Sequence, residues 1–185
     1  MRIVGGDLRG RPLATPKSDA IRPTTDRTRE SLFNILAHAY PEATDGGRVM
    51  DLFAGTGAVG IEALSRGARF GLFVEASVEG RGLLWQNIEA LGLTGRARML
   101  RRDATALGNV GTMEPFHFAF ADPPYAQSLG EKALLAAANG GWLHPGALVV
   151  LEERADIEPM MAPVFHFLEE RTFGDTRMHF YRYKP

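Results

Sequence analysis

The feature that most constrains this chain is a glycine-rich turn between an apolar run and a helical pattern. The run Arg48–Phe53 is typical of a buried strand, and Gly55, Gly57 and Gly60 follow it in G-x-G-x-x-G spacing. Glycine permits a tight turn and a close approach of the backbone to a ligand, and the first N–H groups of a helix are free to donate. The turn therefore predicts a strand–loop–helix unit that binds a ligand at the carboxyl end of a parallel sheet.

Apolar runs and helical patterns alternate downstream, which is typical of a parallel sheet with helices on both faces. We expect strands at 48–53, 70–74, 97–100, 116–121 and 147–151, and helices at 24–40, 58–66, 77–91 and 127–138. The runs 164–168 and 178–183 are rich in aromatic residues and are joined through Gly174-Asp175, so they predict a hairpin that makes the sheet mixed. The expected fold class is therefore α/β and Rossmann-like.

Composition narrows the function. The chain has 185 residues and no cysteine, which excludes disulfides, thiolate metal sites, iron–sulfur clusters and cysteine nucleophiles. Its apolar runs fall far short of the about 20 residues that span a bilayer, and the N-terminus becomes polar at Gly5-Gly6. We therefore expect a soluble cytoplasmic protein with no membrane segment and no signal peptide.

The formal net charge of −1 hides an uneven distribution, because residues 1–30 carry +3 and the remainder −4. The N-terminal segment is also rich in Gly, Pro and Thr, with extended pieces at 2–4 and 8–13 around Gly5-Gly6. This predicts a basic hairpin arm, residues 1–23, in front of a main domain, residues 24–185. A solvated tail explains the same charge equally well. If the arm binds RNA, five arginines are the candidates for contacts to its phosphates: Arg2, Arg9, Arg11, Arg22 and Arg27.

Carboxylates near the glycine turn indicate the ligand. Glu75 stands twenty positions after Gly55, where it can accept hydrogen bonds from two ribose hydroxyls, although a dinucleotide dehydrogenase would show nearly the same pattern. Asp51 favours a cofactor with an ammonium and a sulfonium over a pyrophosphate, which indicates S-adenosylmethionine. Asp103 is a candidate acceptor for the adenine amino group and is about as typical of a cap. The predicted cofactor-binding residues are Asp51, Phe53, Gly55, Thr56, Gly57, Glu75, Asp103 and Ala104.

The fourth apolar strand ends in Asp122, Pro123, Pro124 and Tyr125, which are the predicted catalytic residues. The prolines remove two N–H donors and stiffen the turn, so nearby carbonyl oxygens are free to accept. Hydrogen bonds to Asp122 and the Pro123 carbonyl can hold an aromatic amino group with its lone pair toward a methyl donor, while Tyr125 stacks on the ring. A rigid exit turn is the alternative explanation, and the glycine turn and Glu75 argue against it.

Segment 51–60 and the motif 122–125 resemble the S-adenosylmethionine-dependent amino methyltransferases with a Rossmann-like fold. Four N-terminal segments narrow the resemblance to the bacterial 16S rRNA guanine-N2 methyltransferase family (RsmD type): Arg2–Gly6, Arg9–Arg11, Arg22–Arg27 and Arg29–Asn34. The resemblance runs nearly end to end. It implies a seven-stranded sheet with one antiparallel strand, cofactor binding by the loop glycines, Glu75 and Asp103, a guanine held by residues 122–125, and an N-terminal hairpin that grips RNA.

The resemblance further implies small-subunit rRNA as the partner. We expect this rRNA to be bound within an assembly particle, although the sequence leaves naked RNA and the finished subunit open, and we expect a monomeric protein that requires no metal. Other functions remain open. The motif 122–125 also suits methylation of adenine or cytosine in DNA, or of a protein glutamine, because each target is a planar amino group. A nicotinamide-dependent dehydrogenase leaves the motif unexplained. The intact glycine turn and Asp122 argue against a non-catalytic RNA-binding assembly factor.

Overall fold

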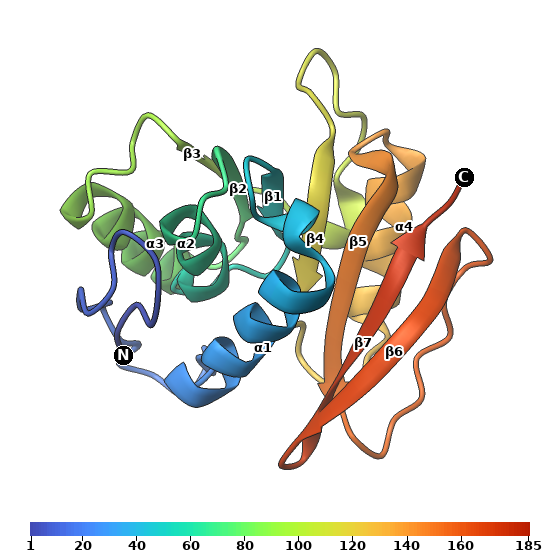
Figure 1. Ribbon diagram of the computed structural model, residues 1–185, viewed down its shortest axis with the longest axis horizontal. Coiled ribbons are helices and arrows are strands. Elements are labelled where there is room, and N and C mark those ends of the chain that lie inside the picture. Colours follow the sequence, from blue (N-terminus) through green and yellow to red (C-terminus); the bar gives the residue numbers. More distant parts are fainter.

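Seven strands form one sheet in the order β3-β2-β1-β4-β5-β7-β6, and the computed structural model describes residues 1–185 (Figure 1). The strands are β1 (Arg48–Asp51), β2 (Phe70–Val74), β3 (Ala97–Leu100), β4 (Phe116–Ala121), β5 (Leu143–Arg154), β6 (Phe165–Phe173) and β7 (Thr176–Tyr183). The helices are α1 (Asp26–Ala39), α2 (Ala58–Ser65), α3 (Val78–Ala90) and α4 (Leu129–Asn139), with 3₁₀ turns η1 (Pro41–Ala43) and η2 (Ala104–Ala106). Only β7 runs antiparallel, so the predicted mixed sheet is confirmed.

The order of the strands creates a crevice at the middle of the sheet. β2 and β3 lie on one side of β1, whereas β4 and β5 lie on the other. The direction of winding therefore reverses between β1 and β4, and ligands bind at such a reversal, outside the carboxyl ends of the strands. Asp51 pairs in register with Phe120, so the ends of β1 and β4 are level with one another.

Strand alternation divides the core between the two faces of the sheet. Phe118 and Phe120 pack in the cluster that includes the buried residues of α1, α2 and α3, while Ala119 and Ala121 pack in the cluster that includes α4. Figure 1 shows α1 in front of the sheet and α4 behind it. The parallel strands are thus covered on both faces, as their continuous apolar runs predict.

Several element boundaries differ from the sequence prediction. β5 begins at Leu143 instead of Ala147, because the chain passes through Pro145 and Gly146 and a register shift of β4 against β5 absorbs the irregularity. β6 extends to Phe173, well beyond the predicted 164–168. α3 tolerates its internal glycines: the Ser77 side chain caps the helix by accepting the Gly80 N–H at 3.0 Å.

The N-terminal segment folds back on itself with one antiparallel bridge, Arg2 to Pro12, instead of two full strands. The Ile3 N–H donates to the Arg11 carbonyl at 2.9 Å, and the Gly10 N–H donates to the Ile3 carbonyl at 2.8 Å. Ile3 and Leu13 are buried in the same core cluster as α1, α2 and α3. The predicted arm is therefore packed against the main body.

A buried charge cluster fastens this arm. The Glu62 carboxylate on α2 has no exposed surface and accepts the backbone N–H groups of Val4 at 2.9 Å and Gly5 at 2.8 Å. The same carboxylate pairs with Nε of Arg29 at 3.2 Å and Nε of Arg66 at 2.8 Å. Because Arg29 is itself fully buried, the basic charge that the N-terminal segment offers to solvent is smaller than its sequence indicates.

Candidate active site

A cavity of about 410 Å³ lies at the carboxyl ends of β1, β2 and β4, at the predicted crevice. Its wall includes ten of the residues selected from sequence: Arg22, Asp51, Phe53, Gly55, Thr56, Glu75, Asp122, Pro123, Pro124 and Tyr125. Gly57, Asp103 and Ala104 do not line it. The two predicted sets, for the cofactor and for the amino group, therefore share one cavity.

The glycine turn adopts the backbone that its residue type allows. Gly55 has φ +55° and Gly57 φ +84°, both in the left-handed region. A Cβ on Gly57 would lie 2.5 Å from Leu84, and one on Gly60 would lie 2.4 Å from Phe73. Gly57 and Gly60 therefore shape the site by close packing of α2 against α3 and β2, while Gly55 lines the cavity.

Glu75 is held rigidly at the end of β2. One carboxylate oxygen accepts the Gly55 N–H at 2.7 Å, and the other accepts the N–H of Ser77 at 2.9 Å and its hydroxyl at 2.7 Å. Gly80 allows this arrangement, because a Cβ there would lie 2.6 Å from the carboxyl carbon of Glu75. A carboxylate has about four lone-pair directions, so Glu75 retains capacity for a ligand hydroxyl.

Asp51 is a buried carboxyl group at the end of β1. Its Oδ2 accepts the Gly60 N–H at 3.2 Å. Burial raises the pKa of Asp51 to about 7, the charge of Glu75 adds to the rise, and the Gly60 N–H opposes it. Near neutral pH the group is therefore poised between its two forms, and a cation in the cavity would favour ionisation.

Asp103 serves as the N-cap of η2 in this structure. Its Oδ1 accepts the Thr105 N–H at 2.8 Å and the Thr105 hydroxyl at 2.7 Å. The carboxylate is exposed and Ala104 beside it is buried. The capping role, one of the two interpretations of the sequence, accounts for these contacts. Cofactor binding by Asp103 and Ala104 stays a prediction.

Asp122 follows β4 and lines the cavity, and β1 lies between β4 and β2, the strand that Glu75 follows. Burial raises the pKa of Asp122 well above its ordinary value, and the nearby carboxyl groups of Glu152 and Asp51 raise it further, while the charge of Arg22 acts in the opposite direction. Burial likewise raises the pKa of Tyr125, so its hydroxyl stays protonated. The Arg22 guanidinium lies over the Tyr125 ring, 5.7 Å from the ring centre.

The segment from Ala20 to Thr24 forms one wall of the cavity, a role that the sequence analysis missed. Glu79 on α3 holds the residues just before this segment. Its carboxylate accepts the N–H groups of Lys17 and Ser18, each at 3.2 Å. Sequence spacing gives no signal for a contact between these distant positions.

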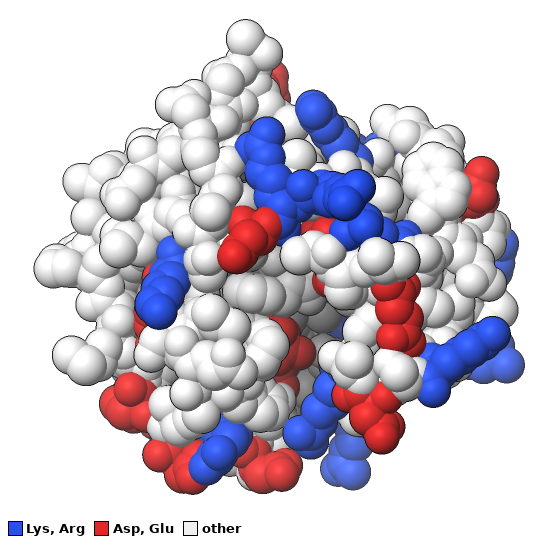
Figure 2. All heavy atoms as spheres, turned by 180° about the vertical axis from the view of Figure 1, so that it is seen from behind, with Lys and Arg blue, Asp and Glu red and all other residues white.

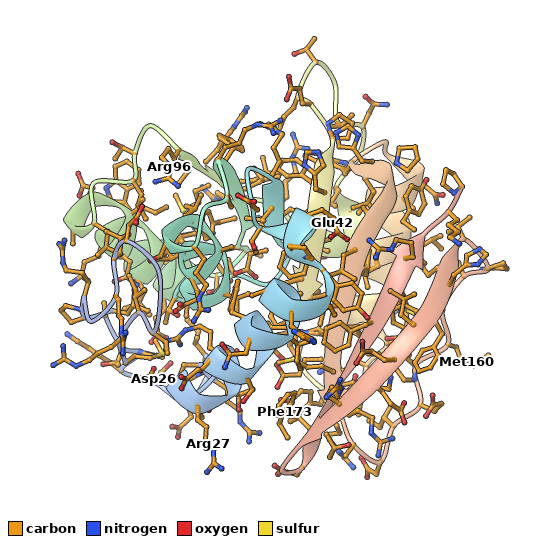
Figure 3. The ribbon with its side chains drawn as sticks, in the orientation of Figure 1. Asp26, Arg27, Glu42, Arg96, Met160 and Phe173 are labelled. Atoms are coloured by element: carbon orange, nitrogen blue, oxygen red, sulfur yellow. The ribbon has the colours of Figure 1, made fainter.

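The five arginines predicted to contact RNA are all exposed, but they do not form one patch of free cations. Arg2 donates to the Gly10 carbonyl at 2.8 Å and Arg11 to the Ala90 carbonyl at 3.0 Å. Arg27 extends away from the first turn of α1 (Figure 3). Figure 2 shows Lys and Arg side chains in the upper part and along the lower edge of the opposite face. Basic surface is not confined to the N-terminal segment, because Arg98 and Arg101 are also exposed.

A second group of potential ligands lies outside the cavity. Atoms of Glu158, Glu170 and His179 that can bind a metal come within 4.8 Å of one another. Glu170 and His179 are paired across β6 and β7, with Nδ1 of His179 3.6 Å from the carboxylate. Burial lowers the pKa of His179, which favours the neutral ring. None of the three residues lines the cavity.

None of the helices combines the length and the apolar character that a membrane-spanning segment requires.

Curated relatives share most of the chain. "Ribosomal RNA small subunit methyltransferase D" of Escherichia coli K12 is 39% identical over 157 residues, which are 84% of this chain and 76% of the relative. The protein of the same name from Haemophilus influenzae is 32% identical over 185 residues, covering 98% of this chain and 93% of the relative.

Solved structures agree with the fold. The Escherichia coli protein yhhF is 33% identical with a TM-score of 0.84, over 100% of this chain and 98% of that one. An RNA methyltransferase from Salinibacter ruber in complex with S-adenosyl-L-homocysteine is 17% identical with a TM-score of 0.65, over 88% of this chain and 94% of that one, and shares the fold. The family described as "Conserved hypothetical protein 95" matches residues 1–182. This chain, with its glycine turn and its Asp-Pro-Pro-Tyr motif on one cavity, therefore belongs to that family of methyltransferases.

Proposed function

We propose that this protein transfers a methyl group from S-adenosylmethionine to the N2 amino group of a guanine in 16S rRNA. The observation that carries the proposal is that Asp122–Tyr125 and the cofactor loop line one cavity. The names of the curated relatives support small-subunit rRNA as the substrate. We further propose that the protein acts in the cytoplasm, as a monomer, on an assembly particle of the small subunit.

The residues at the end of β1 and β2 fit the cofactor. Asp51 and Glu75 place two carboxyl groups near the cavity, where a cofactor with an ammonium and a sulfonium would be stabilised. Glu75 has capacity for ribose hydroxyls, and Gly55 exposes backbone to the ligand. When bound, the cofactor supplies an electrophilic methyl group on sulfur.

Asp122 and the Pro123 carbonyl would hold the guanine amino group. Its lone pair is delocalised into the ring, so hydrogen bonds that turn the lone pair toward the methyl carbon lower the barrier by positioning. Bound S-adenosylmethionine would supply the methyl group to this nitrogen, and the electron pair of the broken C–S bond would stay on its sulfur. The methylated nitrogen then releases a proton to Asp122 or to water.

The charge of the cofactor would prepare Asp122 for this role. In the free protein, burial, Glu152 and Asp51 raise the pKa of Asp122, which favours the protonated form. A cation bound beside Asp51 lowers the pKa of both carboxyl groups, and an ionised Asp122 is the stronger acceptor. We therefore infer that the amino group is held productively only after the cofactor has bound.

The direct test is transfer of labelled methyl groups to small-subunit particles from a strain that lacks the enzyme. Digestion of the RNA to nucleosides should yield N2-methylguanosine at one position of 16S rRNA. Methylation of DNA or of a protein glutamine in parallel reactions, with none of the rRNA, would contradict the proposal. Tight binding of NAD without binding of S-adenosylmethionine would contradict the methyltransferase mechanism altogether.

A further inference from the structure

Glu152 is a buried carboxyl group that enters the mechanism above only through its effect on the pKa of Asp122. The residue lies on β5 and is 5% exposed, and the Thr176 side chain interacts with its carboxyl group. Its Oε2 is buried without a hydrogen-bond partner within the protein. A buried carboxyl oxygen without a partner destabilises the fold, because the desolvation of the group is not repaid. A ligand that supplies the missing donor would remove this cost.

The strand register places Glu152 beside Asp122. Ala121, the last residue of β4, pairs with Leu151 of β5 in a parallel ladder. Asp122 follows Ala121 directly and Glu152 follows Leu151, and the charge of Glu152 acts on Asp122, so the two carboxyl groups lie near one another. Both side chains lie on the face of the sheet that packs against α1, since Phe120 and Val150, two positions earlier, belong to that core cluster. Asp51 stands on the same face of β1. Three adjacent strands thus present a row of carboxyl groups at one edge.

Arg22 and Tyr125 lie at the approach to this row. Both residues line the main cavity and also a second cavity of about 260 Å³, whose wall includes Arg154 and Asp156. The Arg22 guanidinium covers one face of the Tyr125 ring, which is the surface on which a base would stack. Glu152 lines neither cavity while this pair is in place. A base stacked on that face of Tyr125 would take the place of the guanidinium, at the boundary that the two cavities share.

We propose that Glu152 recognises the target base by accepting the N1–H of guanine at its unpartnered Oε2, after the base has displaced Arg22 from Tyr125. The inference rests on the proposed function. Guanine presents two adjacent donors, N1–H and the N2 amino group, and the neighbouring carboxyl groups of Glu152 and Asp122 match them. The ring nitrogen beside the amino group is an acceptor in adenine and cytosine, so an ionised Glu152 would disfavour both bases.

The test replaces the methylated guanine by 2-aminopurine, which keeps the 2-amino group but has an acceptor at N1. Particles are assembled from two RNA pieces that carry either base at the position mapped with the wild-type enzyme. The wild-type protein should methylate guanine at least about tenfold faster than 2-aminopurine, measured as kcat/KM. In Glu152→Gln the amide can donate to N1 of 2-aminopurine, so this preference should shrink or reverse.

Matched controls separate recognition from folding. Glu158→Gln changes an exposed carboxylate of the same chain segment and should leave both rates unchanged. Thermal unfolding and binding of S-adenosylmethionine should be similar in Glu152→Gln and the wild type. If Glu152→Gln fails to fold, the test uses the wild-type protein alone. Equal kcat/KM values of the wild type for guanine and 2-aminopurine would then overturn the inference.

The outcomes also distinguish this inference from the proposed function. If the wild type produces N2-methylguanosine and the Gln variant keeps the wild-type preference, Glu152 is not the reader of N1 and the proposed function stands. If the wild type produces no N2-methylguanosine in the rRNA, the proposed function fails, and the inference fails with it.

Discussion

The side chain of Asn87 on α3 donates to the Thr56 carbonyl in the cofactor loop at 2.9 Å. Its amide oxygen accepts the Ala14 N–H in the N-terminal segment at 2.8 Å. One buried amide therefore joins the cofactor loop to the segment that leads to the cavity wall at Ala20–Thr24. The conformation of the cofactor loop and that of the N-terminal segment are therefore coupled through the Asn87 side chain.

Replacing this amide should disturb both ends. We expect Asn87→Ala to lower the free energy of unfolding by about 1–3 kcal/mol, because it leaves a buried carbonyl and a partly buried N–H without partners. The affinity for S-adenosylmethionine should fall as the loop at Thr56 loosens. Denaturant titration and calorimetric binding measure the two effects. The exposed Asn139→Ala is the matched control, and equal behaviour of the two variants would refute the linkage.

Asp51→Asn should stabilise the cofactor-free protein at high pH. The folded pKa of about 7 exceeds the ordinary value of 3.8, so the folded state holds an extra proton between about pH 4 and 7, and its stability falls as the pH rises through that window. Above pH 7 the asparagine variant should be more stable by up to about 4 kcal/mol, at about 1.4 kcal/mol per pKa unit. Denaturation at pH 5 and pH 8 should show the difference growing with pH. The exposed Asp45→Asn should show no such trend.

The same residue should make cofactor binding depend on pH. A cation favours ionised Asp51, so the affinity of the wild type for S-adenosylmethionine should rise with pH up to about 7 and then level off. Asp51→Asn should bind more weakly, and its affinity should vary less over that range. Calorimetry at several pH values measures this, and parallel profiles for the two proteins would remove Asp51 from cofactor binding.

Asp122→Ala should retain binding of S-adenosylmethionine and lose methyl transfer. Loss of an oriented acceptor in a water-poor site is expected to reduce kcat by about 10²-fold or more. Single-turnover transfer to small-subunit particles separates this loss from slow product release. An unchanged rate would show that Asp122 does not hold the amino group.

Arg9→Ala combined with Arg27→Ala should weaken RNA binding and reduce its dependence on salt. Both side chains are exposed and form no ion pair within the protein, so they are available to phosphate. Each lost phosphate contact should lower the slope of log K against log salt by about 0.7–0.9. Arg98→Ala, an exposed arginine on β3, is the control; an equal effect there would indicate nonspecific attraction.

Sequence reasoning succeeded where the determinants are local or periodic. The apolar run of β4 and the glycines after β1 define a parallel sheet, and parallel strands place Asp51, Glu75 and Asp122 at one edge whatever their distance along the chain. The helix start at Thr25 follows from capping chemistry.

The rest depended on packing between distant segments. Glu62 and Arg29 look like ordinary helix-surface charges in the sequence, and they are buried only because the N-terminal segment crosses α2. Glu152 lies in a charged run that continues an apolar strand, and register alone brings it next to Asp122. For Asp103 the sequence could not separate two roles, because capping a helix and binding a ligand both require a carboxylate.

The hydrogen bonds from the backbone N–H groups of Val4 and Gly5 to Glu62 make the shape of the N-terminal segment depend on the folding of the domain. The N-terminal segment is held by the interior of the domain, so it takes its shape only as the domain itself folds. In a nascent or damaged chain, the arginines of the N-terminal segment would not be held in their folded positions. The segment that we propose to contact RNA and the candidate active site would therefore form together as the domain folds, and would be lost together when it unfolds.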